Sequence, residues 1–143
     1  MKISELENML MSDLHVDKEN LVKASLQTPT LHAKWMKFAS DEGYKLVILN
    51  QRMAKLKKGK WEFYGGKAPP RQYEKTPFGL KLTKGEIPMY IEADDQIQIL
   101  SREISKQSML VDRLSEAVKS IQFRHTNIKN AVEMLKLNAG IMG

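Results

Sequence analysis

Residues 97–135 read IQILSREISKQSMLVDRLSEAVKSIQFRHTNIKNAVEML, and apolar side chains recur in this stretch at alternating spacings of three and four. Ten of the twelve positions in this pattern are apolar, and only Gln107 and His125 depart from it. A seven-residue repeat that is kept over six heptads indicates a long helix that packs along a seam. Asp94 or Asp95 can cap the first turn of this helix. The sequence therefore predicts a mostly α-helical protein with a long C-terminal helix.

The surface that this helix packs against is open to two interpretations. A single seam suits one amphipathic helix on the core of its own chain. Further apolar residues such as Met109 widen the stripe, which favours self-association as a ring-like homo-oligomer. The residues predicted to carry the association are Ile104, Val111, Leu114, Val118, Ile121 and Ile128. The RHTN stretch at 124–127 can break the helix before a last helical segment, which Gly140 and Gly143 would end.

The N-terminal part also has helical periodicity. Apolar residues spaced by three and four predict a short helix over residues 3–14. Asp17 can cap a second helix, which Pro29 ends or bends. A third, longer helix follows from Leu31. Gly43 lies inside it and costs about 1 kcal/mol relative to alanine, so we expect a kink or break there.

The centre of the chain has a different composition. Residues 65–93 contain four of the five prolines together with several glycines, which is typical of a loop or linker. The alternation around 80–82 and 89–91 allows a short β-hairpin. We therefore expect an N-terminal helical region over 1–64, a basic loop over 65–93 and a C-terminal helical oligomerisation region over 94–143, together forming one compact domain.

The positive charge is concentrated in one quarter of the chain. Residues 51–84 contain ten Lys or Arg and two Glu, a balance of +8, whereas the segments on either side each have a balance of −1. Such a patch favours an anionic partner. Aromatic residues are interleaved with it, and we expect their rings to be exposed: Trp61, Phe63, Tyr64, Tyr73 and Phe78. Exposed rings beside cations suit single-stranded nucleic acid, whose bases are free to stack. The residues predicted to bind it are Arg52, Lys55, Lys57, Lys58, Lys60, Trp61, Lys67 and Arg71.

Several other functions lack the residues that they need. The chain contains no cysteine, which excludes disulfides and thiolate chemistry. It contains no phosphate-loop motif, and its three histidines are too far apart for a zinc site. Glu92, Asp94 and Asp95 admit either a magnesium site of a small nuclease or the capping of a helix. We expect no enzymatic activity, no cofactor and no metal, and no association with membranes.

Three stretches resemble a known family. They are PTLHAKWMKF (29–38), LKKGKWEFYGGK (56–67) and SIQFRHTNIKNAVEMLKLNAG (120–140). Together with the order of the parts between them, they resemble the UvsY-like recombination mediators of tailed phages. The resemblance implies a non-enzymatic helical protein of the host bacterial cytoplasm that forms a ring, from hexamer to octamer, through its C-terminal part. It also implies binding of single-stranded DNA and the loading of a RecA-like recombinase onto DNA covered by single-strand-binding protein.

The DNA-binding motif of this family is a Lys-x-Arg pattern before an aromatic pair. Its lysine matches Lys58, and its arginine falls at Lys60, where bidentate phosphate binding is lost although cationic contact remains. Gly59 and Trp61 stand where the family has smaller or aliphatic residues, and Trp61 would add a stacking platform. The alternative function is a structural or adaptor coiled-coil protein without nucleic-acid binding, whose lysines serve solubility.

Overall fold

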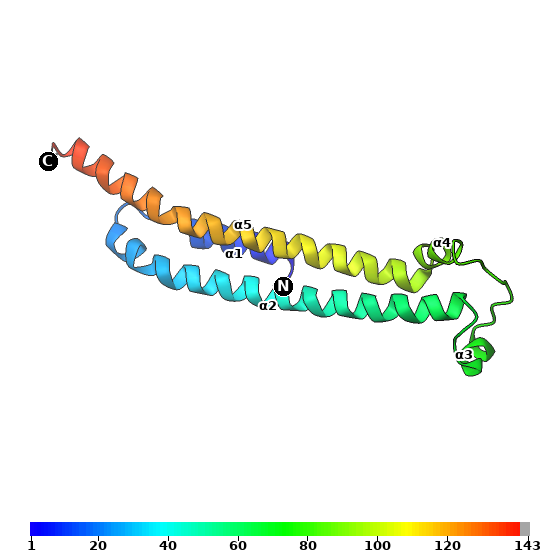
Figure 1. Cartoon of the computed structure of the whole chain (residues 1–143). Helices are drawn as coiled ribbons and strands as arrows, with labels where there is room; N and C mark the ends of the chain where they lie inside the picture. Colours follow the sequence, from blue (N-terminus) through cyan, green and yellow to red (C-terminus); the bar gives the residue numbers. More distant parts are fainter. Residues whose placement is uncertain (141–143) are drawn as a thin grey trace. The chain divides into compact units, whose positions relative to one another are not determined.

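The computed structural model describes residues 1–140 and contains five helices in this range (Figure 1). These are α1 (Ile3–Leu14), α2 (Leu21–Tyr64), α3 (Pro70–Lys75), α4 (Ile87–Glu92) and α5 (Asp95–Asn138). No β-strand occurs in residues 1–140, so the predicted mostly α-helical fold with a long C-terminal helix is confirmed. No helix in the described part of the chain is long and apolar enough to cross a membrane.

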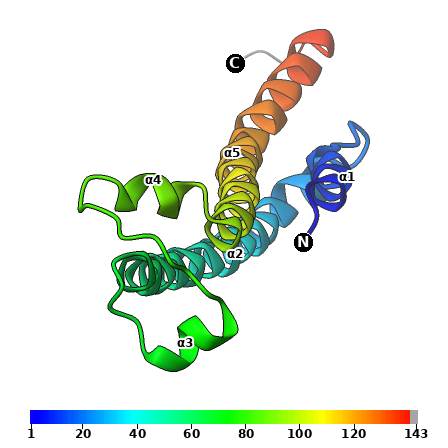
Figure 2. The ribbon, with the colours of Figure 1, turned by 90° about the vertical axis from the view of Figure 1, so that its right-hand side faces the viewer.

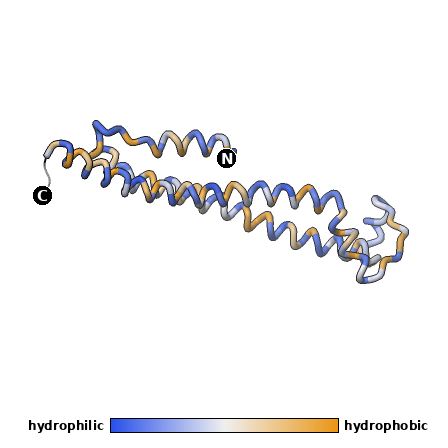
Figure 3. The backbone as a smooth tube through the Cα atoms, turned by 90° about the horizontal axis from the view of Figure 1, so that it is seen from above, coloured by the Kyte–Doolittle hydropathy of each residue, from blue (hydrophilic) through white to orange (hydrophobic). Residues whose placement is uncertain are grey.

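The chain forms two units. The first combines Met1–Gly43 with Met109–Gly143, and the second is the continuous segment Tyr44–Ser108. Helices α2 and α5 each contribute one part to the first unit and another part to the second. Hydrophobic and hydrophilic positions alternate along both long helices, as Figure 3 shows. The first unit also contains α1, and the second also contains α3 and α4.

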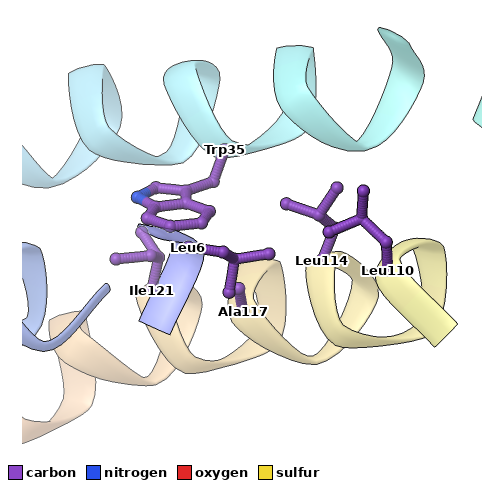
Figure 4. Close-up of a cluster of buried hydrophobic side chains, with 6 residues drawn as sticks. All are labelled: Leu6, Trp35, Leu110, Leu114, Ala117 and Ile121. Carbon is purple, nitrogen blue, oxygen red and sulfur yellow. The ribbon is translucent and has the colours of Figure 1, made fainter. Parts of the chain in front are cut away.

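The core of the first unit is built around Trp35 of α2, whose side chain is completely buried. Leu6 of α1 and Leu114 and Ile121 of α5 pack around its ring (Figure 4). The indole Nε1 of Trp35 donates a hydrogen bond of 2.9 Å to Asp13 Oδ2 at the end of α1. A buried indole needs such a partner, because an unmade hydrogen bond costs free energy. The bond therefore fixes α1 against the large side chain at the centre of the unit.

Helix α2 is continuous through Pro29 and Gly43, so a helix end at Pro29 and a break at Gly43 are wrong, and a bend or kink at these residues stays a prediction. Proline removes one backbone donor from a helix, but Pro29 is exposed and water can reach the turn. The buried Arg124 of α5 adds donors beside it, since its Nη1 lies 2.6 Å from both the Ala24 carbonyl and Thr28 Oγ1. Tertiary contacts thus stabilise a helix that local propensity disfavours. Asp17 caps only the turn before α2, through the Glu19 N–H at 3.0 Å.

Helix α5 also continues through residues 124–127, where a break was predicted. Arg124 is buried against α2 by the contacts described above, so this stretch packs as helix and does not form a new cap. The helix ends as predicted at Gly140, whose φ is +70° and whose N–H donates to the Leu137 carbonyl at 3.1 Å. The predicted role of Gly143 in this end lies outside the described residues.

In the second unit, α2 ends in a Schellman motif. Gly66 has a φ of +75°, and its N–H donates to the Phe63 carbonyl at 3.2 Å. The next N–H, of Lys67, donates to the Glu62 carbonyl at 2.8 Å, which is the second bond of the motif. The turn leads into α3, which lies on the side of α2 away from α5 (Figures 1 and 2).

The predicted β-hairpin over 80–82 and 89–91 is wrong, and the segment 65–93 is not entirely loop. Thr83 and Glu86 close the turn that leads into α4, in which Thr83 Oγ1 donates to Glu86 Oε1 at 2.8 Å and the Glu86 N–H donates to the Thr83 carbonyl at 3.1 Å. Pro88 then stands in the first turn of α4, where its missing N–H costs nothing. The turn at 83–86 and the proline in the first turn therefore start a helix where the apolar alternation had indicated a strand.

Candidate nucleic-acid interface

Helical spacing brings three of the predicted DNA-binding residues to one face of α2. Lys57 and Lys58 lie four and three residues before Trp61, so their side chains neighbour its ring on the helix surface. Both lysines are exposed, and Trp61 keeps 40% of its surface accessible. No carboxylate in residues 1–140 forms an ion pair with either lysine. This face therefore presents free positive charge beside an open aromatic ring.

The same three side chains line a groove of about 950 Å³, which we call the basic groove. Its other lining residues belong to α2, α4 and the first turns of α5, all within the second unit. They are Met53, Pro88, Ile91, Glu92, Ile97, Gln98, Ser101 and Arg102. The groove thus combines exposed cations of α2 and α5 with apolar lining residues and the carboxylate of Glu92.

Lys60, the second cation of the predicted motif, has a different environment. Two residues along a helix correspond to a rotation of about 200°, so Lys60 cannot share a face with Lys58. Its Nζ lies 3.0 Å from Asp94 Oδ2 in an ion pair whose side chains are only 15% and 8% exposed. It also lies 5.9 Å from the centre of the Phe63 ring. The charge of Lys60 is therefore engaged within the protein.

Asp94 connects the end of α2 to the start of α5. Its Oδ1 accepts hydrogen bonds from the N–H groups of Gln96 at 2.9 Å and Ile97 at 3.2 Å, which caps α5 as predicted. Its Oδ2 accepts the Tyr64 hydroxyl at 2.6 Å in addition to Lys60. The capping interpretation of this acidic stretch is thus confirmed for Asp94.

Titration of this cluster follows from its contacts. Burial alone would raise the pKa of Asp94, but hydrogen bonds from Tyr64 and Lys60 outweigh burial and hold that pKa below its ordinary value. Burial, together with the hydrogen bond to Asp94, raises the pKa of Tyr64 to about 12. Asp94 is therefore charged and Tyr64 neutral at physiological pH.

Most of the aromatic rings that were expected to stack on bases pack on one another. The Phe63 side chain is buried, and its ring is stacked on Tyr73 with centroids 5.1 Å apart. Phe78 and Tyr90 join the cluster through Tyr64, at 5.1 and 5.8 Å. The Tyr73 hydroxyl donates to the Phe63 carbonyl at 2.7 Å, which ties α3 to the end of α2. The prediction of a series of exposed rings is wrong, because Phe63 is buried and the rings around it are half-buried against one another.

The remaining predicted cations are dispersed. Arg52 lies 4.0 Å from Glu103 of α5 in an exposed contact, which contributes little to stability. Lys55 is exposed on α2 outside the basic groove. Lys67 is exposed just after the end of α2, and Arg71 is exposed on α3. They extend the positive surface of the second unit without lining the groove.

The residues predicted for oligomerisation divide into two groups. Leu114, Ile121 and Ile128 are buried within their own protomer. Ile104, Val111 and Val118 are half-buried. Larger apolar surface is exposed elsewhere in the first unit, at Val22, Leu26, Phe123, Met134, Leu135 and Leu137.

Some residues of the site left no signal in the sequence. Arg102 and Gln98 face the basic groove from α5, more than thirty positions after the lysine cluster. Their proximity depends on α2 and α5 running antiparallel in this unit, which the Lys60–Asp94 and Arg52–Glu103 contacts establish. In the described range, no group of three or more potential ligands is arranged to hold a metal ion.

Comparison with known proteins gives a consistent result. The family described as "Recombination, repair and ssDNA binding protein UvsY" matches residues 9–141. A crystal structure of the bacteriophage T4 recombination mediator protein UvsY, lattice type II, matches with a TM-score of 0.85 and 20% identity, covering 97% of this chain and 98% of that one. Lattice type I of the same phage protein gives a TM-score of 0.83 at 19% identity and covers 94% and 98%. No curated protein sequence matches.

Proposed function

This chain belongs to the UvsY family of recombination, repair and single-stranded DNA-binding proteins, and we propose that this recombination mediator binds single-stranded DNA through the basic groove. The observation that carries the proposal is the exposed pair Lys57 and Lys58 beside the open ring of Trp61. Single-stranded DNA offers phosphates to the two amines and an unpaired base to the ring. Lysine contacts phosphate as a point charge, so the pair binds without reading sequence.

We further propose that the protein acts as a ring-like homo-oligomer, between a hexamer and an octamer. The first unit supports this, because Phe123 and Leu137 on α5 and Val22 and Leu26 on α2 leave large apolar side chains exposed in the protomer. Apolar surface of this kind commonly marks a site of protein association. Several weak grooves on one assembly would then bind one strand with high avidity.

The consequence for recombination is also a proposal. A DNA strand held over successive protomers would present its free segments to a RecA-like recombinase. The same strand would bind single-strand-binding protein more weakly. This role requires binding and release of DNA in the host bacterial cytoplasm and no bond cleavage, so we propose that the protein is not an enzyme. The membership of this chain in a family of recombination and repair proteins supports the proposal.

The test compares two double variants of equal charge. Lys57→Ala with Lys58→Ala removes the free cations of the groove, and we expect a weaker affinity for a labelled oligonucleotide and a smaller salt dependence, by a slope of about 0.7 for each phosphate that the variant no longer neutralises. The control is Lys18→Ala with Lys23→Ala, which removes two exposed cations outside the second unit. Fluorescence anisotropy over a salt series measures both. Equal affinity and slope for the two double variants would reject the groove as the binding site.

A further inference from the structure

The basic groove contains a second wall that phosphate binding by Lys57 and Lys58 does not explain. This wall comes from the first turns of α5, which place Arg102 and Gln98 in the groove. Arg102 is exposed, and no carboxylate in residues 1–140 forms an ion pair with it. The groove therefore has free cations on both of its helical sides.

Some residues that line the groove are unsuited to phosphate. Ile97 of α5 is buried and Ile91 of α4 is half-buried, and both are apolar, while Pro88 and the carboxylate of Glu92 line the groove as exposed groups. A phosphate inside the groove would lose hydration against the apolar residues and would be repelled by Glu92. A nucleobase is flat, uncharged and able to stack on Trp61, and its amino groups can donate to a carboxylate. The apolar and aromatic lining thus fits a base, and the exposed cations fit phosphates.

We propose that the basic groove holds one unstacked nucleobase of single-stranded DNA on the ring of Trp61, while Arg102 from α5 contacts the backbone opposite Lys57 and Lys58. This inference rests on the proposed function, and it adds how the strand lies and which residue completes the site. A duplex is excluded by this arrangement, because its bases are paired and stacked and would have to be flipped out to enter. The preference for single strands then follows from the shape of the groove.

The experiment changes the DNA first, so that it does not depend on the folding of a variant. Two single-stranded oligonucleotides of equal length are compared, one of normal deoxynucleotides and one in which every base is replaced by hydrogen, so that only the sugar–phosphate chain remains. We expect the abasic strand to bind roughly 5- to 150-fold more weakly, the range that one base–aromatic stack contributes. The salt slopes of the two strands should agree, because their phosphates are the same.

The intrinsic fluorescence provides an independent measurement. The protein has two tryptophans, and Trp35 is completely buried, so quenching by the normal strand reports on Trp61. We expect quenching by the normal strand and little by the abasic strand. Trp61→Leu should remove both the quenching and the discrimination between the two strands.

The role of Arg102 is tested by Arg102→Gln against Lys106→Gln. Both changes remove one exposed cation from α5, but Lys106 lies one turn further along and outside the groove. We expect only Arg102→Gln to reduce the salt slope, by about 0.7 for each protomer in contact with DNA. If neither strand binds the wild-type protein, the proposed function itself fails. If both strands bind equally, or if the two variants behave alike, the function stands and the base-holding groove is overturned.

Discussion

Lys58 and Lys60 stand two residues apart in the same motif, yet the structure predicts opposite consequences for their removal. Lys58 is exposed in the basic groove, whereas the amine of Lys60 is bound to Asp94 at 3.0 Å. Lys58→Ala should therefore weaken DNA binding without affecting stability. Lys60→Ala should reduce stability and leave the salt dependence of DNA binding unchanged.

The magnitudes follow from these environments. Without the amine of Lys58, one phosphate fewer is neutralised, and the salt slope falls by about 0.7 for each protomer bound to DNA. When the salt is raised from about 50 to about 200 mM, both proteins lose affinity, and the loss for the variant should be smaller than that for wild type by a factor of about 2.5 for each such protomer. A hydrogen bond to a charged group contributes about 1.5–3 kcal/mol. Asp94 keeps three other donors when Lys60 is removed, so we expect a reduction in stability at the lower end, about 1.5–2 kcal/mol.

The assays are a salt series of anisotropy measurements and urea unfolding, both on protein whose assembly has been checked by sedimentation. Lys18→Ala is the control, since this exposed lysine lies outside the second unit. The reasoning is refuted if Lys60→Ala lowers the salt slope as much as Lys58→Ala does while its unfolding midpoint stays that of wild type. That result would mean that Lys60 leaves Asp94 to contact phosphate.

Three further predictions concern stability and assembly. Asp94→Ala removes the cap of α5 and the acceptor of Tyr64, and should lower the free energy of unfolding by about 2–4 kcal/mol in urea titrations. Because the pKa of Asp94 is lowered on folding, its contribution to stability should be present above its unfolded pKa of about 3.9 and be lost as the pH falls through the folded value. The pKa of Tyr64 is raised to about 12, so its contribution to stability should be lost as the pH rises from about 10 towards that value. Unfolding measured as a function of pH, with Asp94→Ala as reference, tests both. Leu114→Asp should unfold the first unit, since this side chain is buried beside Trp35. Phe123→Asp changes an exposed residue, so it should leave the helical circular dichroism intact and reduce the mass measured by sedimentation. An unchanged mass would exclude the exposed face of α5 from the assembly.

The long C-terminal helix was predictable because its heptad pattern is a local property that the packing then uses. Leu114, Ile121 and Ile128 occupy the buried side of this pattern. The errors arose where contacts distant in sequence overrule local preference. Pro29 is tolerated inside α2 beside the buried Arg124, about a hundred positions later in the sequence. Arg124 in turn lies in the stretch where the sequence had indicated a break.

The candidate site was predictable in part for a similar reason. Charge density located the lysine cluster, and helical spacing determines which cations share a face with Trp61. Composition could not separate a ring that faces solvent from one that forms a core, so Phe63 was grouped with Trp61 although only the latter is exposed. Nor could it pair Lys60 with Asp94, because that contact depends on how the chain turns back between α2 and α5.

The division of the chain into units has a consequence for the order of folding. The second unit, Tyr44–Ser108, is a continuous segment, so its contacts close shorter loops than those of the first unit. The core of the first unit joins Leu6 to Ile121, and Glu7 pairs with Arg113 at 2.8 Å, so α1 must wait for the last third of the chain. Closing so long a loop is slow compared with forming local contacts. We therefore expect the second unit to form first when the chain refolds, and α1 to gain protection against proteases later.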